Sequence, residues 1–234
     1  MTASPLETLV AFRIGPVPVS IPVLTTWVIM ILVLLTAFAL TRNLKLKAGA
    51  AQTVIELLVA TIDAQIRATL QRDPSPYRAL IGAVFVFILL ASWSAMVPGI
   101  EPPTAHIETD AALALITFVA TLYYGVRANG LLGYLKTFAQ PTWVMIPLNL
   151  VEQITRTFSL MVRLFGNVMS GVFVVGIVLS LAGLLVPIPL MALDLLTGTV
   201  QAYIFAVLAT VFIGAAVDGD RQENPISVKT KESE

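Results

Sequence analysis

The chain has 234 residues, of which 57% are hydrophobic and 12% are charged, and its 14 basic and 14 acidic residues cancel. This composition places most of the chain in lipid, and without a basic block it indicates no nucleic-acid partner. The sequence has no cysteine and one histidine, His106, which excludes disulfides, thiolate sites and a histidine metal cluster. It also contains no phosphate-binding loop or dinucleotide fingerprint, so we expect no cofactor.

Five predominantly apolar windows are long enough to cross a bilayer. They cover residues 21–41, 79–98, 110–127, 148–182 and 190–217. We therefore predict an all-α membrane protein with about five transmembrane helices in a single transmembrane domain, residues 21–217. Residues 1–20 precede this domain and a tail of residues 218–234 follows it. The uncharged run of residues 14–41 is too long for the core of a signal peptide, which favours a retained first span.

The basic residues divide sharply between the two sides of a five-span arrangement. One side receives Arg42, Lys45, Lys47, Arg67, Arg72, Arg78, Arg127, Lys136, Arg221, Lys229 and Lys231. The other receives Glu7, Glu101, His106, Glu108 and Asp110, with Arg13 as its only basic residue. Because Lys and Arg concentrate on the cytoplasmic side of membrane proteins, we predict an extracytoplasmic N-terminus and a cytoplasmic C-terminus. The compact length and short polar tail favour a bacterial inner membrane.

The connection between the first two spans contains a helical pattern over residues 51–71. Its apolar positions recur at helical spacing and its polar positions occupy the opposite face: Val54, Leu58, Ile62, Ile66 and Leu70 against Gln52, Glu56, Asp63 and Arg67. This pattern predicts an amphipathic helix on the cytoplasmic membrane surface. Packing of the same helix against a partner subunit is an equally open interpretation and is compatible with the first.

The fourth apolar segment is unusually long. Leu148 to Ala182 contains no proline, and at 1.5 Å per residue it gives a helix of about 50 Å, against a hydrocarbon core of about 30 Å. We predict a steeply tilted helix, with a kink near Gly166, Gly171 or Gly176 as the alternative. Pro147 is expected to separate this helix from the segment that precedes it. Gly183, Pro187 and Pro189 are expected to form the turn of a hairpin with the last helix.

Polar side chains line one face of each helix of this hairpin. On the long helix the face comprises Glu152, Arg156, Ser159, Arg163, Asn167 and Ser170, and on the last helix it comprises Asp194, Thr197, Gly198 and Gln201. In an antiparallel hairpin, Arg163 is expected level with Gln201, and Ser170 level with Asp194.

Arg163 is the most informative of these residues. A guanidinium stays protonated at any cellular pH, and placing one at the centre of a bilayer costs roughly 3 kcal/mol. Asp194 is expected about 10 Å away along the helix, too far for a good partner. An arginine without a fixed counter-charge in its own chain indicates an external anion.

Structural interpretations stay open for the other polar residues. Glu152 and Arg156 can neutralise each other at i, i+4 spacing. Asn167 and Gln201 can connect helices through hydrogen bonds. Asp194 can be a structural acid bonded to Thr197 or Ser170.

Several motifs together resemble subunit a of F-type rotary ATP synthases. They are Arg163-Leu164-Phe165-Gly166-Asn167, Ser159-Leu160, Gln201-Ala202-Tyr203-Ile204-Phe205, Pro102-Pro103-Thr104-Ala105 and Gly130-Leu131-Leu132-Gly133-Tyr134-Leu135-Lys136. The resemblance covers most of the chain from about residue 85 to 217. It implies a non-catalytic, ion-translocating subunit of the membrane sector Fo. The implied partners are the c-ring, which the tilted hairpin would face, the peripheral-stalk b subunits, the F1 sector indirectly and the lipid bilayer.

The resemblance also implies roles for individual residues. Arg163 would be the essential arginine, which attracts the c-ring carboxylate and blocks direct ion passage between two half-channels. Asn167, Ser170, Asp194, Gln201 and Glu152 are the expected residues of the ion pathway. The sequence departs from relatives at Val172, where they often carry a protonatable group. A proton is the expected coupling ion, and Na⁺ is the alternative. A secondary transporter with an anionic substrate, or a membrane scaffold, would be a different class, but we find no internal repeat of the transporter type.

Overall fold

The structure, a computed structural model, describes residues 10–14, 17–42, 49–96, 102–139, 145–183 and 186–217. Several predicted features lie outside these residues: the charges of Glu7, Lys45, Lys47, Glu101, Arg221, Lys229 and Lys231, and the tail of residues 218–234.

Helices make up nearly all of the described chain. They are α1 (Ile21–Thr41), α2 (Ala50–Leu70), α3 (Ser75–Trp93), α4 (Ile107–Ala139), α5 (Met145–Ala182) and α6 (Pro187–Val217), with short 3₁₀ turns η1 (Ser94–Met96) and η2 (Pro103–Ala105). Within the described ranges, 5 helices are long and apolar enough to cross a membrane, which are all of the α-helices except α2. The predicted fold class, an all-helical protein with five candidate spans, is confirmed.

A small β-hairpin precedes α1 and was not predicted. Strand β1 (Val10–Ile14) pairs antiparallel with β2 (Val17–Ser20), with an irregularity in register between Val10 and Phe12. The two strands are rich in valine and isoleucine, whose branched side chains favour extended backbone.

Prolines expected to interrupt helices instead lie in their first turns. Helix α5 begins at Met145, so Pro147 is inside it, and α6 begins at Pro187 and includes Pro189. The first backbone N–H groups of a helix have no intrahelical acceptor, so a proline there sacrifices no hydrogen bond. Helix α5 thus starts two residues before Pro147, and Pro187 and Pro189 belong to α6 and not to the predicted turn. Gly183, the first residue of that predicted turn, has φ 72°.

Helix α4 extends well past the expected third span of residues 110–127. It runs to Ala139 with one non-helical residue, Gly130, at φ 71° and ψ 165°. The bend lets Tyr134 pack on Gly125, where an added Cβ would lie 2.5 Å from the tyrosine Cε2. The charge-free window missed this extension because it ended at Arg127, and the helix continues past this charge.

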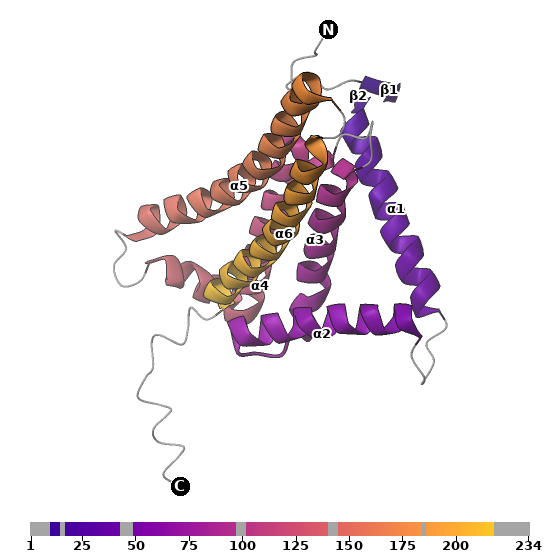
Figure 1. Ribbon diagram of the computed structural model, residues 1–234. Coiled ribbons are helices and arrows are strands. Elements are labelled where there is room, and N and C mark those ends of the chain that lie inside the picture. Colours follow the sequence, from indigo (N-terminus) through magenta and orange to yellow (C-terminus); the bar gives the residue numbers. More distant parts are fainter. Residues whose placement is uncertain are drawn as a thin grey trace.

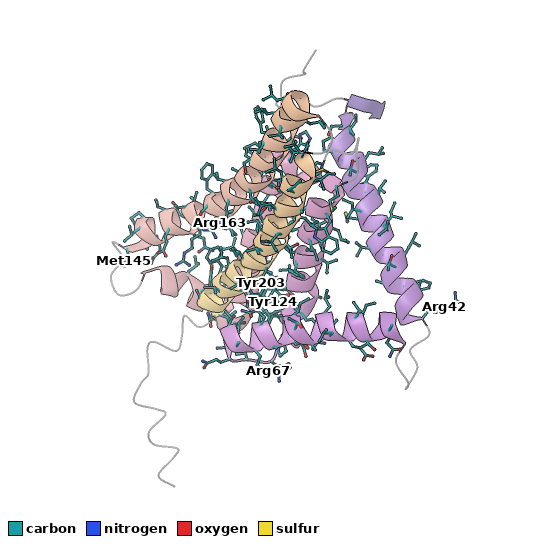
Figure 2. All side chains as sticks on the ribbon, in the orientation of Figure 1. Arg42, Arg67, Tyr124, Met145, Arg163 and Tyr203 are labelled. Atoms are coloured by element: carbon teal, nitrogen blue, oxygen red, sulfur yellow. The ribbon has the colours of Figure 1, made fainter. Side chains whose placement is uncertain are left out.

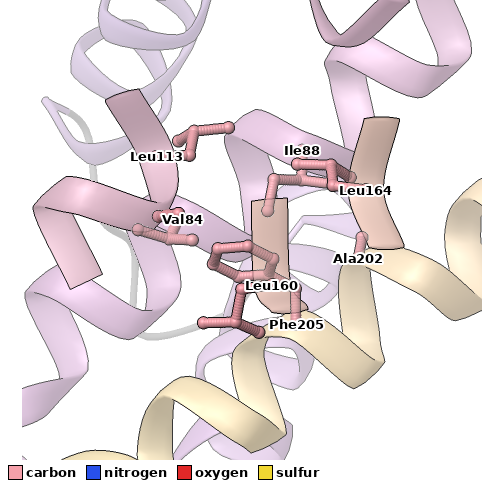
Figure 3. Close-up of a cluster of buried hydrophobic side chains, with 8 residues drawn as sticks. Val84, Ile88, Leu113, Leu160, Leu164, Ala202 and Phe205 are labelled. Atoms are coloured by element: carbon pink, nitrogen blue, oxygen red, sulfur yellow. The ribbon is translucent and has the colours of Figure 1, made fainter. Parts of the chain in front are cut away.

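Helices α3, α4, α5 and α6 form a bundle, and α2 crosses one of its ends (Figure 1). We call this the α2 end. The opposite, far end holds the end of α3, the start of α4 and the adjoining ends of α5 and α6, while α1 leans away at one side (Figure 1). One cluster of buried hydrophobic side chains forms the bundle core, and all four helices contribute to it (Figure 3). Its members are Val84, Ile88, Leu113, Ala114, Leu160, Leu164, Ala202 and Phe205.

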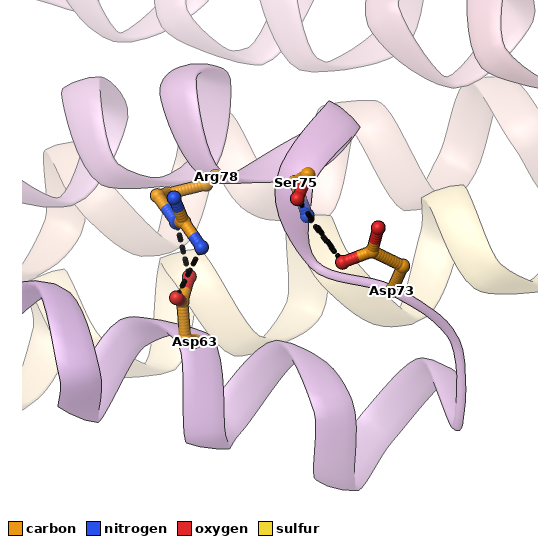
Figure 4. A network of polar contacts seen from close by, with 4 residues as sticks. All are labelled: Asp63, Asp73, Ser75 and Arg78. Atoms are coloured by element: carbon orange, nitrogen blue, oxygen red, sulfur yellow. Dashed lines mark hydrogen bonds and ion pairs between the residues drawn. The ribbon is translucent and has the colours of Figure 1, made fainter.

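Helix α2 is held on the bundle through the second half of its length. Ile66 is 0% exposed and Leu70 is 3% exposed, and both pack against residues of α3 and α6. Asp63 accepts two hydrogen bonds from the Arg78 guanidinium of α3 (Figure 4). The first half leaves Val54 64% exposed and Leu57 67% exposed. This half presents an apolar surface that either lipid or a partner subunit would cover, and so both sequence interpretations of α2 stay open.

Candidate functional site

The pairing of α5 with α6 determines which polar groups meet. The Asp194 carboxylate of α6 lies directly over Gly171 of α5, where an added Cβ would be 1.9 Å from Oδ1. About two turns further along the hairpin, Leu164 and Ala202 share the core cluster. The antiparallel register therefore agrees to within one residue with the predicted alignment of Ser170 with Asp194.

Arg163 lies about halfway along α5 (Figure 2) and is exposed. No acidic side chain of the described residues forms an ion pair with it. Within an apolar window of 18 residues, only 11% of the α5 residues are buried, against 44% of the α6 residues. A permanent cation on a largely uncovered apolar helix has no counter-charge within the described chain, which fits a site completed by another molecule.

Glu152 forms an ion pair with Arg156 and not with Arg163. Its carboxylate pairs with Arg156 one turn along α5. The Arg156 guanidinium also lies 5.4 Å from the centre of the Phe212 ring. The pair is partly exposed, so it neutralises two charges near the α2 end at little energetic gain.

The side-chain amide groups of Asn167 and Gln201, near Arg163, donate no hydrogen bond within the described residues. Gln201 is 7% exposed, and within the described ranges its Nε2 and the Nδ2 of Asn167 are buried without a hydrogen-bond partner. Neither amide nitrogen therefore makes the hydrogen bond between helices that the structural interpretation of Asn167 and Gln201 would require. Buried donors in proteins are nearly always satisfied, so these two indicate water or a partner group at this level.

The hydroxyls near Asp194 do not bind its carboxylate. Thr197 donates to the Asp194 backbone carbonyl at 3.0 Å, and Ser170 donates to the Asn167 carbonyl at 2.8 Å. The interpretation of Asp194 as an acid held by Thr197 or Ser170 is therefore wrong. Both hydroxyls instead bond within their own helices, as serine and threonine commonly do.

A polar cavity of about 350 Å³ opens between α4, α5 and α6 on the α2 side of Arg163. Its polar lining comprises Thr117, Thr121, Tyr134, Asn149, Glu152, Gln153, Arg156 and Thr157. A groove of about 610 Å³ shares Glu152, Arg156 and Phe212 with this cavity and reaches Arg163. The cavity and the groove together thus extend from the α2 side of the bundle to the arginine.

A second cavity, of about 190 Å³, lies on the other side and contains Asp194. We call it the Asp194 cavity. Besides Asp194 it is lined by residues of α3, η1, α5 and α6 and by Pro102: Ser92, Ala95, Met96, Val172, Val175, Gly176, Met191 and Leu195. Val172 is in the wall, so this position offers no titratable group.

A packed layer separates the two polar spaces. On α5 the groove lining ends at Arg163 and the Asp194 cavity lining begins at Val172, leaving residues 164–171, about 12 Å of helix. Leu164 is 0% exposed and Val168 is 3% exposed, and both pack within this level. The two spaces therefore approach Arg163 and Gln201 from opposite ends of the bundle.

The sequence analysis missed three buried polar side chains at the far end. Ser92, Thr104 and Asp110 carry oxygens without a hydrogen-bond partner among the residues described. Asp110 was predicted as the first residue of the third span and as a charge of the outer side, not as a buried group. An acid in the first turn of an apolar helix was the available signal.

Five candidate spans, a fixed cation exposed on one of them and a separate cavity that holds an acid define a multi-pass membrane protein with charged groups inside its spans. The family described as ATP synthase A chain matches residues 23–214. The chain belongs to this family.

Relatives from several bacteria match the chain over nearly their full length. It is 53% identical to ATP synthase subunit a 2 of Bradyrhizobium sp. (strain BTAi1), over 93% of this chain and 97% of the relative. It is 41% identical to ATP synthase subunit a of Albidiferax ferrireducens, over 94% and 95%. It is also 41% identical to ATP synthase subunit a 1 of Chlorobaculum parvum, over 90% and 94%.

Proposed function

We propose that the chain is the ion-translocating stator subunit a of a rotary ATP synthase membrane sector. The observation that carries this function is the position of Arg163. It is exposed on α5, unpaired among the described residues, and lies in the groove where the groove meets the layer that separates it from the Asp194 cavity. The subunit itself performs no covalent chemistry; it controls where ions enter and leave.

The proposed mechanism follows from the charge of Arg163. A mobile carboxylate on a rotating c subunit would be attracted to the guanidinium and held in its ionised form. The same charge would repel a cation trying to pass directly between the two cavities in a medium of low dielectric constant. An ion would therefore travel from one cavity to the other only on the rotor.

The remaining predicted site residues fit along this route. Asp194 would exchange ions in the Asp194 cavity. Gln201 and Asn167 would place their side-chain amide groups close to Arg163. Ser170 stands on the exposed part of α5 between the two levels. Glu152, paired with Arg156, would border the polar space at the α2 end.

We further propose that the α2 end faces the cytoplasm of a bacterium and the far end faces outward across the inner membrane. The basic residues Arg67, Arg72, Arg78 and Arg127 belong to α2, its connection to α3, and the α2-side halves of α3 and α4. The c-ring would cover the exposed face of α5 that carries Arg163, and the peripheral-stalk b subunits would link the subunit to F1. In this orientation residues 1–20 are extracytoplasmic and residues 218–234 are cytoplasmic.

The test replaces Arg163 by alanine in the complete ATP synthase. Arg163→Ala should leave the complex assembled and abolish both ATP synthesis and ATP-driven ion pumping in membrane vesicles. Arg67→Ala, which removes an exposed arginine of α2, is the matched control and should retain both activities. Proton and sodium uptake are followed separately, because a proton is the proposed coupling ion and Na⁺ is the alternative.

Two results would contradict the proposal. The first is an Arg163→Ala complex that still pumps ions at the rate of the unmodified enzyme. The second is steady ion or substrate transport by this chain reconstituted without the other subunits, which would indicate a self-contained transporter.

A further inference from the structure

The far end of α4 holds a second buried acid that the proposed mechanism does not use. Asp110 lies in the first turn of α4 and is 0% exposed. Neither of its carboxylate oxygens has a hydrogen-bond partner among the described residues. Its backbone N–H donates to the His106 carbonyl at 3.4 Å, as part of the helix start, but its side chain caps no backbone group.

An ionised carboxylate in this position is unfavourable without a partner. Burying an isolated charge costs many kcal/mol unless it is paired or neutralised. No arginine or lysine of the described residues forms an ion pair with Asp110. The group must therefore bind a proton or a small cation, and this requirement is what makes it a candidate ion site.

A buried hydroxyl lies on the neighbouring turn. Thr104 of η2 is 0% exposed, and its Oγ1 has no partner in the described part of the chain. Turn η2 contacts α4, and because helix side chains tilt toward the N-terminus of their helix, we infer that the Asp110 side chain lies on the η2 side of α4. The two residues together offer carboxylate and hydroxyl oxygens, the donors that hard cations prefer.

The residue before η2 borders the Asp194 cavity. Pro102, which directly precedes η2, forms part of the cavity wall. Ser92, whose Oγ is also buried and unpartnered among the described residues, forms another part. Ser92 packs on Gly198 of α6, where an added Cβ would lie 3.2 Å from Oγ. Gly198 is one turn from Asp194 on α6.

We propose that Asp110, assisted by Thr104, binds the coupling cation on its way to Asp194. It would be a second acid of the entry route at the far end. The inference depends on the proposed function, because a cation must travel toward Arg163 for such a site to matter. The apolar Val172 in the cavity wall leaves Asp194 as the acid of that cavity among the described residues, so a nearby second acid would shorten the interval between binding sites.

The test measures cation entry through the complete enzyme reconstituted in liposomes, after removal of F1. Initial rates of entry from the far-end side are recorded against cation concentration, with a pH-sensitive dye for protons and radioactive sodium for Na⁺. Asp110→Asn keeps the shape and removes the charge. It should lower the entry rate or raise the half-saturating concentration roughly tenfold or more, for the cation that the unmodified enzyme carries. Glu108→Gln, an exposed acid of the same turn, should match the unmodified enzyme.

A second variant covers the case in which Asp110→Asn does not assemble. Thr104→Val removes a hydroxyl that has no partner among the described residues, so the fold should tolerate it. It should slow entry a few-fold. Entry at the unmodified rate in Asp110→Asn, or in Thr104→Val where only that variant assembles, overturns the inference.

The outcome is separable from that of the proposed function. If the unmodified enzyme carries cations and Arg163→Ala uncouples it, normal entry in Asp110→Asn rejects the Asp110 site alone. If the unmodified enzyme carries no cation, the proposed function fails first.

Discussion

The Asp194 carboxylate of α6 packs directly against Gly171 of α5 in the α5–α6 hairpin. The carboxylate occupies the space that any side chain at residue 171 would fill, with Oδ1 1.9 Å, Cγ 2.4 Å and Oδ2 2.7 Å from an added Cβ. The glycine is required here for close approach rather than for backbone conformation. The contact places Asp194 against α5 at the level of Ser170, at the inner wall of the far-end cavity.

The first prediction concerns this contact. Gly171→Ala should push the Asp194 carboxylate out of its position, because two groups cannot share the same volume. Since the displaced group is the end of a side chain, we expect a modest loss of stability, about 1–3 kcal/mol, and a clear loss of ion entry. Gly82→Ala on α3 is the control, because the nearest atom to an added Cβ there, Ile62 Cδ1, is at an ordinary contact distance of 3.6 Å and Gly82 lines neither the groove nor the two cavities of the route. Equal entry rates in the two alanine variants would show that the carboxylate position is unimportant.

The second prediction concerns the charge of Asp194. Asp194→Asn should slow passive ion entry from the far end by roughly tenfold or more, without making the membrane leaky. The direct path would remain blocked because Arg163 is unchanged. Thr197→Val removes a hydroxyl that donates within its own helix at 3.0 Å, and should have little effect. The measurement is the initial rate of entry into liposomes; an unchanged rate in Asp194→Asn would remove the residue from the route.

The third prediction concerns the bend of α4. Gly130 has φ 71° and ψ 165°, a conformation that residues with a side chain avoid. Gly130→Ala should cost about 1–3 kcal/mol and misdirect Tyr134, which lines the α2-side cavity. Gly133→Ala, at a helical position where the nearest atom to an added Cβ is 3.5 Å away, should be neutral or slightly stabilising. Thermal unfolding of the detergent-solubilised complex compares the two, and equal transition temperatures would contradict the prediction.

Much of the fold was predictable because membrane spans follow from composition. The cost of leaving backbone groups unpaired in lipid forces apolar segments into helices, and five such segments were visible. The register of α5 on α6 was also accessible, because one polar residue per turn defines the facing side of each helix. The helix boundaries were less accurate, since hydropathy does not register that Pro147 and Pro187 are tolerated in a first turn.

The hydrogen-bonding state of each polar residue was not predictable. The sequence left Glu152, Asp194 and Gln201 each with a structural and a functional interpretation. The structure pairs Glu152 with Arg156, leaves the Gln201 amide nitrogen unpartnered in the described ranges, and gives Asp194 no bond from Ser170 or Thr197. These hydrogen bonds depend on distances of a few ångströms between helices. The periodicity of residues along one helix gives no information on those distances.

The sequence by itself determined that an arginine would lie within a membrane span, because charge and hydropathy are local properties of the chain. The tertiary structure alone decided what surrounds that arginine. It placed a packed apolar layer between two polar cavities and enclosed Asp110 at the start of α4. Enclosure depends on which helices pack together, and an acid that looks solvent-exposed in a connection becomes a buried ion site only when neighbouring helices exclude water from it.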